Sequence, residues 1–375
     1  MNILFIGHED YINGASKSLL NIIDALISDN NIHVLTSYSK GEFFDELQKR
    51  KVTVIIRPFY RWCVLKNGLI NWIICLLKWK LKHVWINHKT AMEMVSYIIE
   101  NKIDIIHSNT SVINIGALIS NKCNVKHVWH IREFADIDFD MYPLIKKQNY
   151  YNYMNRNADK FICVSNAIKA HYSFLEENKK VVIYNGIDSK YCINRVKNIE
   201  SNIIKFLIAG RISIAKGQQE AIKACELLSD RGITNFELYI AGTGTYSNDF
   251  SEKIKDKVHF LGTIKDMTNL RKNMHIELVC SRAEAFGRVT AEAMMGGVPV
   301  IGSNTGGTLE LIQPGITGYL YEYGNVEDLA DKMSHLISNP ELRLKMGYNA
   351  QIYAKKNFTI DKCITEIKTL YMSLI

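Results

Sequence analysis

Two glutamates and two cations in the second half of the chain have the types and spacing of a ligand-binding site. Arg211 and Lys216 lie in the glycine-containing run AGRISIAKG, which we expect to follow a strand. Such a turn suits a diphosphate, because Arg can grip two oxygens at once and Lys adds a point charge. Glu284 and Glu292 lie eight residues apart in EAFGRVTAEAMMGGVPVI, and carboxylates accept hydrogen bonds from the hydroxyls of polyols. The alternative, a solvated surface, remains open at this point.

Small residues surround these four side chains. We expect Phe286 and Gly287 to open the helix that carries Glu292, so that their backbone N–H groups face a phosphate or a sugar hydroxyl. A second turn, NTGG at residues 304–307, follows the next strand and lets a backbone approach a ligand closely. Paired carboxylates could instead bind a metal, but neither an Asp-x-Asp motif nor a histidine cluster accompanies them, so we expect no metal.

The first half of the chain offers one comparable loop, GHEDYINGASKSLL. In it Gly14, Ala15 and Ser16 are expected to begin a helix whose free N–H groups could hold an anion or a sugar hydroxyl. The loop lacks the GxGxxG pattern, and a helix start made only of small residues is the alternative interpretation.

These loops must be positioned by strands and helices, which alternate along the whole sequence. Apolar β-branched runs separated by amphipathic stretches predict two doubly wound α/β domains, each with a parallel sheet that binds ligands at the carboxyl ends of its strands. The expected boundary is the polar run at residues 187–202. The expected strands are residues 3–6, 33–36, 52–56, 103–107, 127–130, 161–164 and 181–184, then 204–209, 237–241, 258–261, 276–280 and 298–302.

Composition limits the function classes. The chain has 375 residues and a net charge of +8, which predicts two folded domains. Its longest apolar stretch is about ten residues, too short to span a bilayer, and the start MNILFIGHED reads as a strand rather than a signal peptide. Eight scattered cysteines without a CxxC pair favour buried thiols in a reducing cytosol.

One segment carries almost all of the positive charge. Residues 57–89 hold seven Lys or Arg, no Asp or Glu, and four of the five tryptophans. An amphipathic segment rich in Trp and Lys is typical of a helix that lies on an anionic membrane surface. The alternative is a core helix whose lysines reach back to solvent. No nucleic-acid-binding module is recognisable, so we expect no nucleic-acid partner.

The motifs together resemble those of the family 4 glycosyltransferases of the GT-B fold, in which two Rossmann-like domains face each other across a cleft. The matching elements are AGRISIAKG, the Glu284-x7-Glu292 signature, NTGGTLELI, TGYLY, VSNAIK and NGID, in the family's order over most of the chain. The resemblance implies an acceptor-binding domain at residues 1–190 and a nucleotide-sugar-binding domain at residues 200–357. It also implies a C-terminal helix, residues 358–375, that crosses back to the first domain.

The resemblance assigns roles residue by residue. Arg211 and Lys216, after Gly210, are expected to hold the donor diphosphate, Glu284 the sugar hydroxyls and Glu292 the ribose. Phe286, Gly287 and Arg288 are expected along the sugar and phosphates, mainly through backbone amides.

In the first half, His130 of HVWHI occupies the position of the family histidine near the reacting sugar, and Glu133 could orient it or contact the acceptor. Gly14 and Ala15 are expected to contact the donor. Their loop reads Asn13-Gly14-Ala15-Ser16, where the family commonly shows two glycines before Ala and often an acidic residue in place of Ser16.

The expected activity is therefore a retaining, metal-independent hexosyl transfer in polysaccharide synthesis. No cofactor is expected beyond a UDP- or GDP-linked sugar as co-substrate. The acceptor is expected to be a glycan linked to polyprenyl diphosphate, and the protein to be cytoplasmic and peripheral on the inner face of the plasma membrane, docked by residues 57–89. A catalytically silent binder of sugar nucleotides or glycans, and a sugar-nucleotide epimerase on the same fold, are the alternatives.

Overall fold

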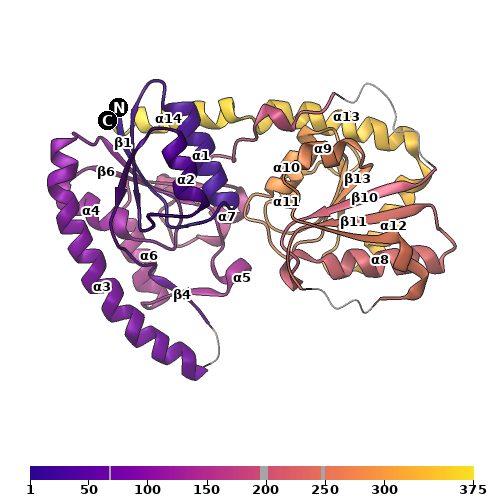
Figure 1. Cartoon of the computed structure of the whole chain (residues 1–375), viewed down its shortest axis with the longest axis horizontal. Helices are drawn as coiled ribbons and strands as arrows, with labels where there is room; N and C mark the ends of the chain where they lie inside the picture. The colour runs from indigo at the N-terminus through magenta and orange to yellow at the C-terminus, as the bar shows by residue number, and fades with distance from the viewer. Residues whose placement is uncertain (67–68, 195–201, 246–249) are drawn as a thin grey trace. The chain divides into compact units, whose positions relative to one another are not determined.

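The chain folds into two compact units, shown in the computed structural model in Figure 1. The structure describes residues 1–66, 69–194, 202–245 and 250–375, without the side chains of residues 69–72, 75, 78, 79 and 81. Unit 1 comprises Met1–Gly186 and Ile360–Ile375, and unit 2 comprises Ile187–Thr359. Residues 187–190, which we expected in the first domain, belong to unit 2. Of the expected polar boundary, residues 195–201 lie outside the described part.

Unit 1 is built on a seven-stranded parallel sheet with the order β3-β2-β1-β5-β6-β8-β9. The strands are nearly continuous apolar runs because helices cover both faces of such a sheet. The strand expected at residues 181–184 is β9, which begins one residue earlier and ends two residues earlier. The strands are β1 (Asn2–Ile6), β2 (Asn31–Thr36), β3 (Thr53–Ile56), β5 (Ile105–Ser108), β6 (Lys126–Ile131), β8 (Lys160–Cys163) and β9 (Lys180–Val182).

The helices of unit 1 include the C-terminal one, α14, which packs against α1 (Figure 1). Its buried residues Cys363, Ile364 and Ile367 join the same apolar core as Ile3 and Phe5 of β1. The helices are α1 (Gly14–Leu26), α2 (Glu42–Lys49), α3 (Leu69–Glu100), α4 (Ile115–Cys123), α5 (Asp136–Phe139), α6 (Lys147–Arg156), α7 (Asn166–His171) and α14 (Ile360–Met372), with one 3-10 turn, η1 (Glu177–Lys179).

Two strands of unit 1 were not predicted. β4 (Cys63–Leu65) and β7 (Met141–Pro143) pair antiparallel with each other, outside the main sheet. Each has three residues, which is too short for a two-residue alternation to be recognised.

Unit 2 contains a six-stranded parallel sheet with the order β12-β11-β10-β13-β14-β15. β15, in the TGYLY motif, is the strand that periodicity missed. The strands are β10 (Ile204–Ala209), β11 (Phe236–Ala241), β12 (Val258–Gly262), β13 (Ile276–Val279), β14 (Val300–Ser303) and β15 (Gly318–Tyr321). The helices are α8 (Gln218–Asp230), α9 (Met267–Lys272), α10 (Arg288–Met295), α11 (Thr308–Leu311), α12 (Val326–Ser338) and α13 (Pro340–Asn357), with η2 (Ser189–Tyr191), η3 (Ile214–Lys216) and η4 (Glu252–Lys257).

Strand order decides which loops of unit 2 lie together. β10, β13 and β14 are neighbours in that order and run parallel, so the loops that follow their carboxyl ends leave the same edge of the sheet. These loops carry residues 210–217, 280–287 and 304–307. The three sequence stretches singled out in the second half of the chain are therefore adjacent.

Candidate active site

Lys216 and Glu284 meet at this edge of unit 2. The Lys216 ammonium donates to Oε1 of Glu284 at 2.5 Å, and the Ser281 hydroxyl donates to the same oxygen at 2.6 Å. The two charged side chains are 35% and 15% exposed, so the pair is accessible to a ligand. A cation and a carboxylate at one strand end can serve a phosphate and a hydroxyl that lie next to each other.

The turn that carries Lys216 depends on a glycine. Gly217 has φ +70°, and a Cβ at this position would lie 2.0 Å from the carbonyl oxygen of Cys280. Only glycine tolerates both the left-handed backbone and this approach. The turn from β10 is thereby packed directly on the loop that follows β13, which places Lys216 beside Glu284.

Arg211 lies at the start of the same turn, directly after Gly210. It is exposed, and its carbonyl oxygen accepts a hydrogen bond from Gln218, which holds the turn against the first turn of α8. A Cβ on Gly210 would lie 4.0 Å from Cδ of Lys216, so the Lys216 side chain passes close to Gly210. The predicted cluster of Gly210, Arg211 and Lys216 is thus one local structure, with Glu284 contributed from the neighbouring loop.

Glu292 is held by two arginines. Arg271 is 1% exposed and makes two hydrogen bonds to Glu277, at 2.7 and 2.9 Å, and one to Oε2 of Glu292 at 3.2 Å. Arg288 reaches Oε1 of Glu292 at 3.1 Å. Burial disfavours the charge on Arg271, but the ion pairs with Glu277 and Glu292 outweigh it and raise its pKa. The sequence analysis did not single out Arg271, which carries no motif signal.

The structure refines the expected helix start after Glu284. The helix α10 begins at Arg288 with Gly287 as its N-cap at φ +94°, so Phe286 precedes the helix rather than opening it. The Phe286 side chain is 3% exposed and packs edge-on against Phe358, with ring centroids 5.8 Å apart. Its side chain is therefore part of the core, and only its backbone can serve a ligand.

The NTGG turn interlocks with this loop. The Gly307 amide donates to the carbonyl oxygen of Glu284 at 2.6 Å, and a Cβ on Gly306 would lie 2.5 Å from the same oxygen. The glycines of this turn, which we expected to let a backbone approach a ligand, lie close to the Glu284 backbone. It fixes the position of Glu284 on its loop.

In unit 1, backbone amides at the start of α1 are hydrogen-bonded within their own loop. Asn13 caps the helix: its side-chain oxygen accepts the amides of Ala15 and Ser16, both at 2.9 Å, and Ser16 returns a bond to the Asn13 amide at 2.7 Å. The helix start at Gly14 was predicted correctly. The expectation that the amides of Ala15 and Ser16 are free for an anion is wrong, because this capping box occupies them.

His130 is buried at the carboxyl end of β6. It is 1% exposed, and its Nδ1 lies 3.1 Å from Nη2 of Arg132 and 3.2 Å from Nε2 of His107. Burial first, and then the charge of Arg132, lower the pKa of His130 well below its usual value, so the ring is neutral at physiological pH. Arg132 and His107 were missed from the sequence, although Arg132 follows His130 by two residues, the spacing of one strand face.

Glu133 has a different role from the one the sequence suggested. Its Oε1 accepts hydrogen bonds from the Thr110 hydroxyl and from the amide and hydroxyl of Ser111, at 2.6 to 2.7 Å. These bonds hold the loop after β5. Glu133 thus anchors that loop rather than orienting His130.

The basic segment at residues 57–89 divides into a buried and an exposed part. Trp62 is 3% exposed and stacks on Trp129 at 5.6 Å, so it belongs to the core and cannot anchor a membrane contact. On α3, Trp85 is 69% and Leu77 is 63% exposed. The side chains of Trp72 and Trp79 lie outside the described residues.

In the part of the chain with described side chains, no group of three or more His, Cys, Asp or Glu has the arrangement of a metal site. Within those same residues, none of the helices combines the length and apolar character needed to cross a bilayer.

Comparison with known proteins agrees across both units. The sequence model described as Glycosyltransferase Family 4 matches residues 12–191, and the model described as Glycosyl transferases group 1 matches residues 193–353. The chain is 28% identical to the uncharacterized glycosyltransferase MJ1178 of Methanocaldococcus jannaschii, and the alignment covers 97% of this chain and 95% of that one.

Two further relatives extend the comparison. The O-antigen biosynthesis glycosyltransferase WclY of Escherichia coli is 24% identical, with 76% of this chain and 83% of WclY covered. Among solved structures, Anabaena HepE in complex with UDP has a TM-score of 0.80 at 22% identity, and both chains are covered in full. At that identity the structural likeness shows a shared fold.

Proposed function

Because the chain belongs to the family 4 glycosyltransferases of the GT-B fold, we propose that it moves a sugar from a UDP- or GDP-linked donor to a glycan acceptor with retention of configuration and without a metal ion. The observation that carries the proposal is the convergence in unit 2 of Arg211, Lys216 and Glu284 at one edge of the sheet. Structures of Anabaena HepE, which shares this fold, are complexes with UDP and with UDP-glucose, which supports a nucleotide-linked donor.

Different residues of unit 2 bind different parts of the donor. Arg211 and Lys216 bind the diphosphate and stabilise the negative charge that develops as it leaves. Glu284 accepts hydrogen bonds from sugar hydroxyls, and Glu292, fixed by Arg271 and Arg288, accepts them from the ribose. The backbone of residues 286–288 lies along the sugar and phosphates. Gly14 and His130 contribute from unit 1.

The reaction breaks the bond between the anomeric carbon and the diphosphate and forms one to an acceptor hydroxyl on the same face of the sugar. The acceptor proton passes to an oxygen of the departing diphosphate, so no protein base is consumed. The protein's main task is then to stabilise the leaving group, which its two cations serve. The glutamates bind substrate and do not act as the acid and base of a glycoside hydrolase.

The acceptor is a glycan on a polyprenyl diphosphate, and the enzyme acts in polysaccharide synthesis at the inner face of the plasma membrane. Relatives named for O-antigen and capsular polysaccharide biosynthesis support this setting. The exposed apolar and basic residues of α3, which include Trp85 and Lys82, support contact with an anionic membrane surface.

The test is a transfer assay with purified chain, a panel of UDP- and GDP-sugars and lipid-linked acceptors, read by release of nucleoside diphosphate and by mass of the product. Arg211→Ala and Glu284→Ala should each lower kcat/KM by about 10- to 100-fold, the loss of one charge-assisted hydrogen bond. Arg231→Ala and Glu252→Ala, on the outer surface of unit 2, are matched controls.

Three results would contradict the proposal. Transfer at the wild-type rate by both Arg211→Ala and Glu284→Ala would defeat the site. Donor binding without transfer or hydrolysis, over a broad acceptor panel, would identify a binding protein. Conversion of the donor sugar without any acceptor would identify an epimerase.

A further inference from the structure

A chain of buried hydrogen bonds links the last helix of unit 1 to His130. The Tyr371 hydroxyl, on α14, lies 2.6 Å from Nδ1 of His107, and Nε2 of His107 lies 3.2 Å from Nδ1 of His130. Arg132 lies 3.1 Å from the same Nδ1. All four residues are at most 8% exposed. Groups this deeply buried must satisfy one another's hydrogen-bonding needs.

Arg132 determines which nitrogen carries the proton in each ring of this hydrogen-bond series. A guanidinium can only donate, so Nδ1 of His130 must accept, and the proton of the neutral His130 ring is on Nε2. Since Nδ1 of His130 has no hydrogen, His107 must face it with a protonated Nε2. Nδ1 of His107 is then an acceptor, and the Tyr371 hydroxyl must donate to it. The neutral state of both rings agrees with pKa values that burial, and then Arg132, hold well below the usual value.

The last group in this series of hydrogen bonds is the Nε2–H of His130. Nε2 of His130 is buried and, among the described residues, has no hydrogen-bond partner. Leaving a buried N–H unpaired destabilises a fold, so such a donor calls for an explanation, and service to a ligand is one. The histidine at the strand end of unit 1 thus has both a fixed tautomer and an unused donor.

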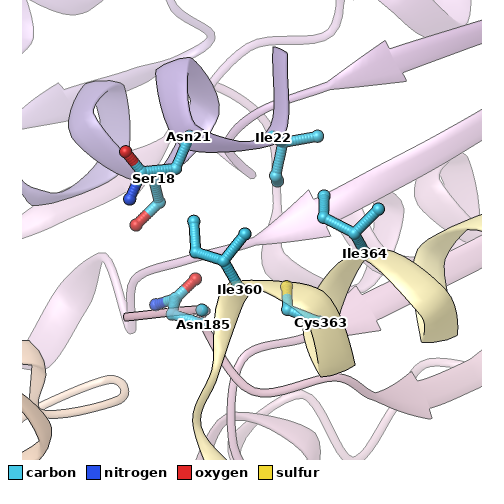
Figure 2. Close-up of a pocket in the computed structure, with 8 residues that line it drawn as sticks. Ser18, Asn21, Ile22, Asn185, Ile360, Cys363 and Ile364 are labelled. Carbon is cyan, nitrogen blue, oxygen red and sulfur yellow. The ribbon is translucent and has the colours of Figure 1, made fainter. Parts of the chain in front are cut away.

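Arg132 is itself held from two further sides. Its Nε donates to Oδ1 of Asn109 at 2.7 Å, after β5, and its Nη1 donates to Oδ1 of Asn185 at 2.5 Å. Figure 2 shows Asn185 beside Ile360, at the start of α14, in a small pocket that Ser18 of α1 also lines. Arg132 cannot rotate away from His130 without breaking these bonds.

We propose that Arg132 and Tyr371 are positioning residues that lock His130 as a neutral Nε2–H donor for a hydrogen bond to a substrate oxygen. The inference rests on the proposed function only in naming the ligand a substrate. His130 then stabilises negative charge on that oxygen by donation and does not act as a general base. The lock extends from β6 through His107 to α14, so the C-terminal helix contributes to the site.

The first test reads the tautomer without any substrate. Long-range proton–nitrogen spectra of deuterated, 15N-histidine-labelled protein distinguish protonated from unprotonated ring nitrogens, and His130→Gln and His107→Gln assign the signals. Both rings should carry the proton on Nε2 from pH 6 to 8. Tyr371→Phe should leave both protons where Arg132 places them, on Nε2, and shift only the 15N signal of Nδ1 of His107, which loses its donor. Tyr97→Phe, which removes the same kind of bond from the separate His33–Tyr97 pair at 2.7 Å, should leave both rings unchanged.

The second test separates positioning from general support of the fold. With the nucleotide sugar that the panel shows to be turned over, Tyr371→Phe should lower kcat about 3- to 10-fold, the worth of one hydrogen bond, with little change in KM. His130→Gln keeps an N–H donor but has no tautomers, so adding Tyr371→Phe to it should cost nothing further. An equal loss in both backgrounds would show a merely structural role.

The spectra decide the proposal on their own. A proton on Nδ1 of His130 in the unaltered protein, or an unchanged Nδ1 signal of His107 in Tyr371→Phe, would overturn it. If no nucleotide sugar is turned over, the proposed function fails while the tautomer assignment is still tested. A charged His130 ring within the same pH range would also overturn it.

Discussion

At the scale of single residues, the site consists of charged groups that are paired with one another before they meet a ligand. Lys216 forms an ion pair with Glu284 at the carboxyl edge of the sheet of unit 2, and Arg271 and Arg288 form ion pairs with Glu292. Such pairing fixes side-chain positions in advance, so less freedom is lost when substrate binds. The residue types could be predicted from the sequence, but their partners could not.

Asp138 in unit 1 gives a residue-level prediction about pH. Burial first, and then the charge of Glu133, raise its pKa to about 7, and its Oδ1 has no hydrogen-bond partner among the described residues. The folded state therefore keeps a proton between about pH 4 and pH 7 that the unfolded state releases. The contribution of Asp138 to the free energy of unfolding falls as pH rises through this window and is constant above it.

Asp138→Asn should remove this loss. The difference in melting temperature between the variant and the unaltered protein should be more positive at pH 8 than at pH 5. The corresponding change in the free energy of unfolding is on the order of 1 kcal/mol. Asp140→Asn changes an exposed carboxylate on the same loop and is the control. Equal effects of Asp138→Asn at both pH values would contradict the assignment.

At the scale of elements, the exposed side chains of α3 bear on whether this helix contacts a membrane or is only a core helix. Its described side chains include Ile73, Leu77, Val84 and Trp85, each about half or more exposed, and Lys89 lies 5.7 Å from the Trp85 ring. An exposed apolar surface of this kind is what the membrane hypothesis requires. Because Trp62 is buried in the core, the proposed membrane contact must be made by α3.

Vesicle binding tests α3 directly. Leu77→Ser and Trp85→Ala should each weaken co-sedimentation with phosphatidylglycerol vesicles about 3- to 10-fold, because each removes apolar area from the interface. Binding should weaken with salt and be lower on phosphatidylcholine. Tyr348→Ala, equally exposed on α13, is the matched control. Failure of the unaltered protein to bind anionic vesicles would sink the hypothesis.

The shortest strands show where the apolar repeat in the sequence fails to predict structure. The parallel strands other than β15 were predicted because each is an apolar run between helical patterns. The three-residue strands β4 and β7 were missed, because they pair only with each other and their length holds no repeat. β15 has the sequence GYLY, whose two end residues are buried and whose two middle residues are half-buried, so it lacks the alternation that predicts a strand.

At the scale of the whole molecule, the chain leaves unit 1 and returns to it. Ile360–Ile375 belongs to unit 1, and its Ile367 is fully buried in the core of that unit. The stability of unit 1 therefore depends on residues that are synthesised after all of unit 2.

Ile367→Ala should lower the free energy of unfolding of unit 1 by about 2–5 kcal/mol, the usual cost of truncating a buried Ile. All five tryptophans lie in unit 1, so their fluorescence during urea denaturation reports on this unit. Met372→Ala, on the same helix but 67% exposed, is the control. An unchanged tryptophan transition in Ile367→Ala would show that α14 does not support unit 1.

By itself, the sequence determined the two doubly wound sheets and the positions of the glycine-containing turns. Both follow from local patterns, the repeat of apolar residues and the backbone freedom of glycine, which are written into consecutive residues. Only the tertiary structure decided that Ala15 and Ser16 are capped, that Glu133 anchors a loop, and that Tyr371 meets His107 across 264 residues. Those contacts depend on how distant elements pack, and a side chain's type does not specify which partner packing will bring to it.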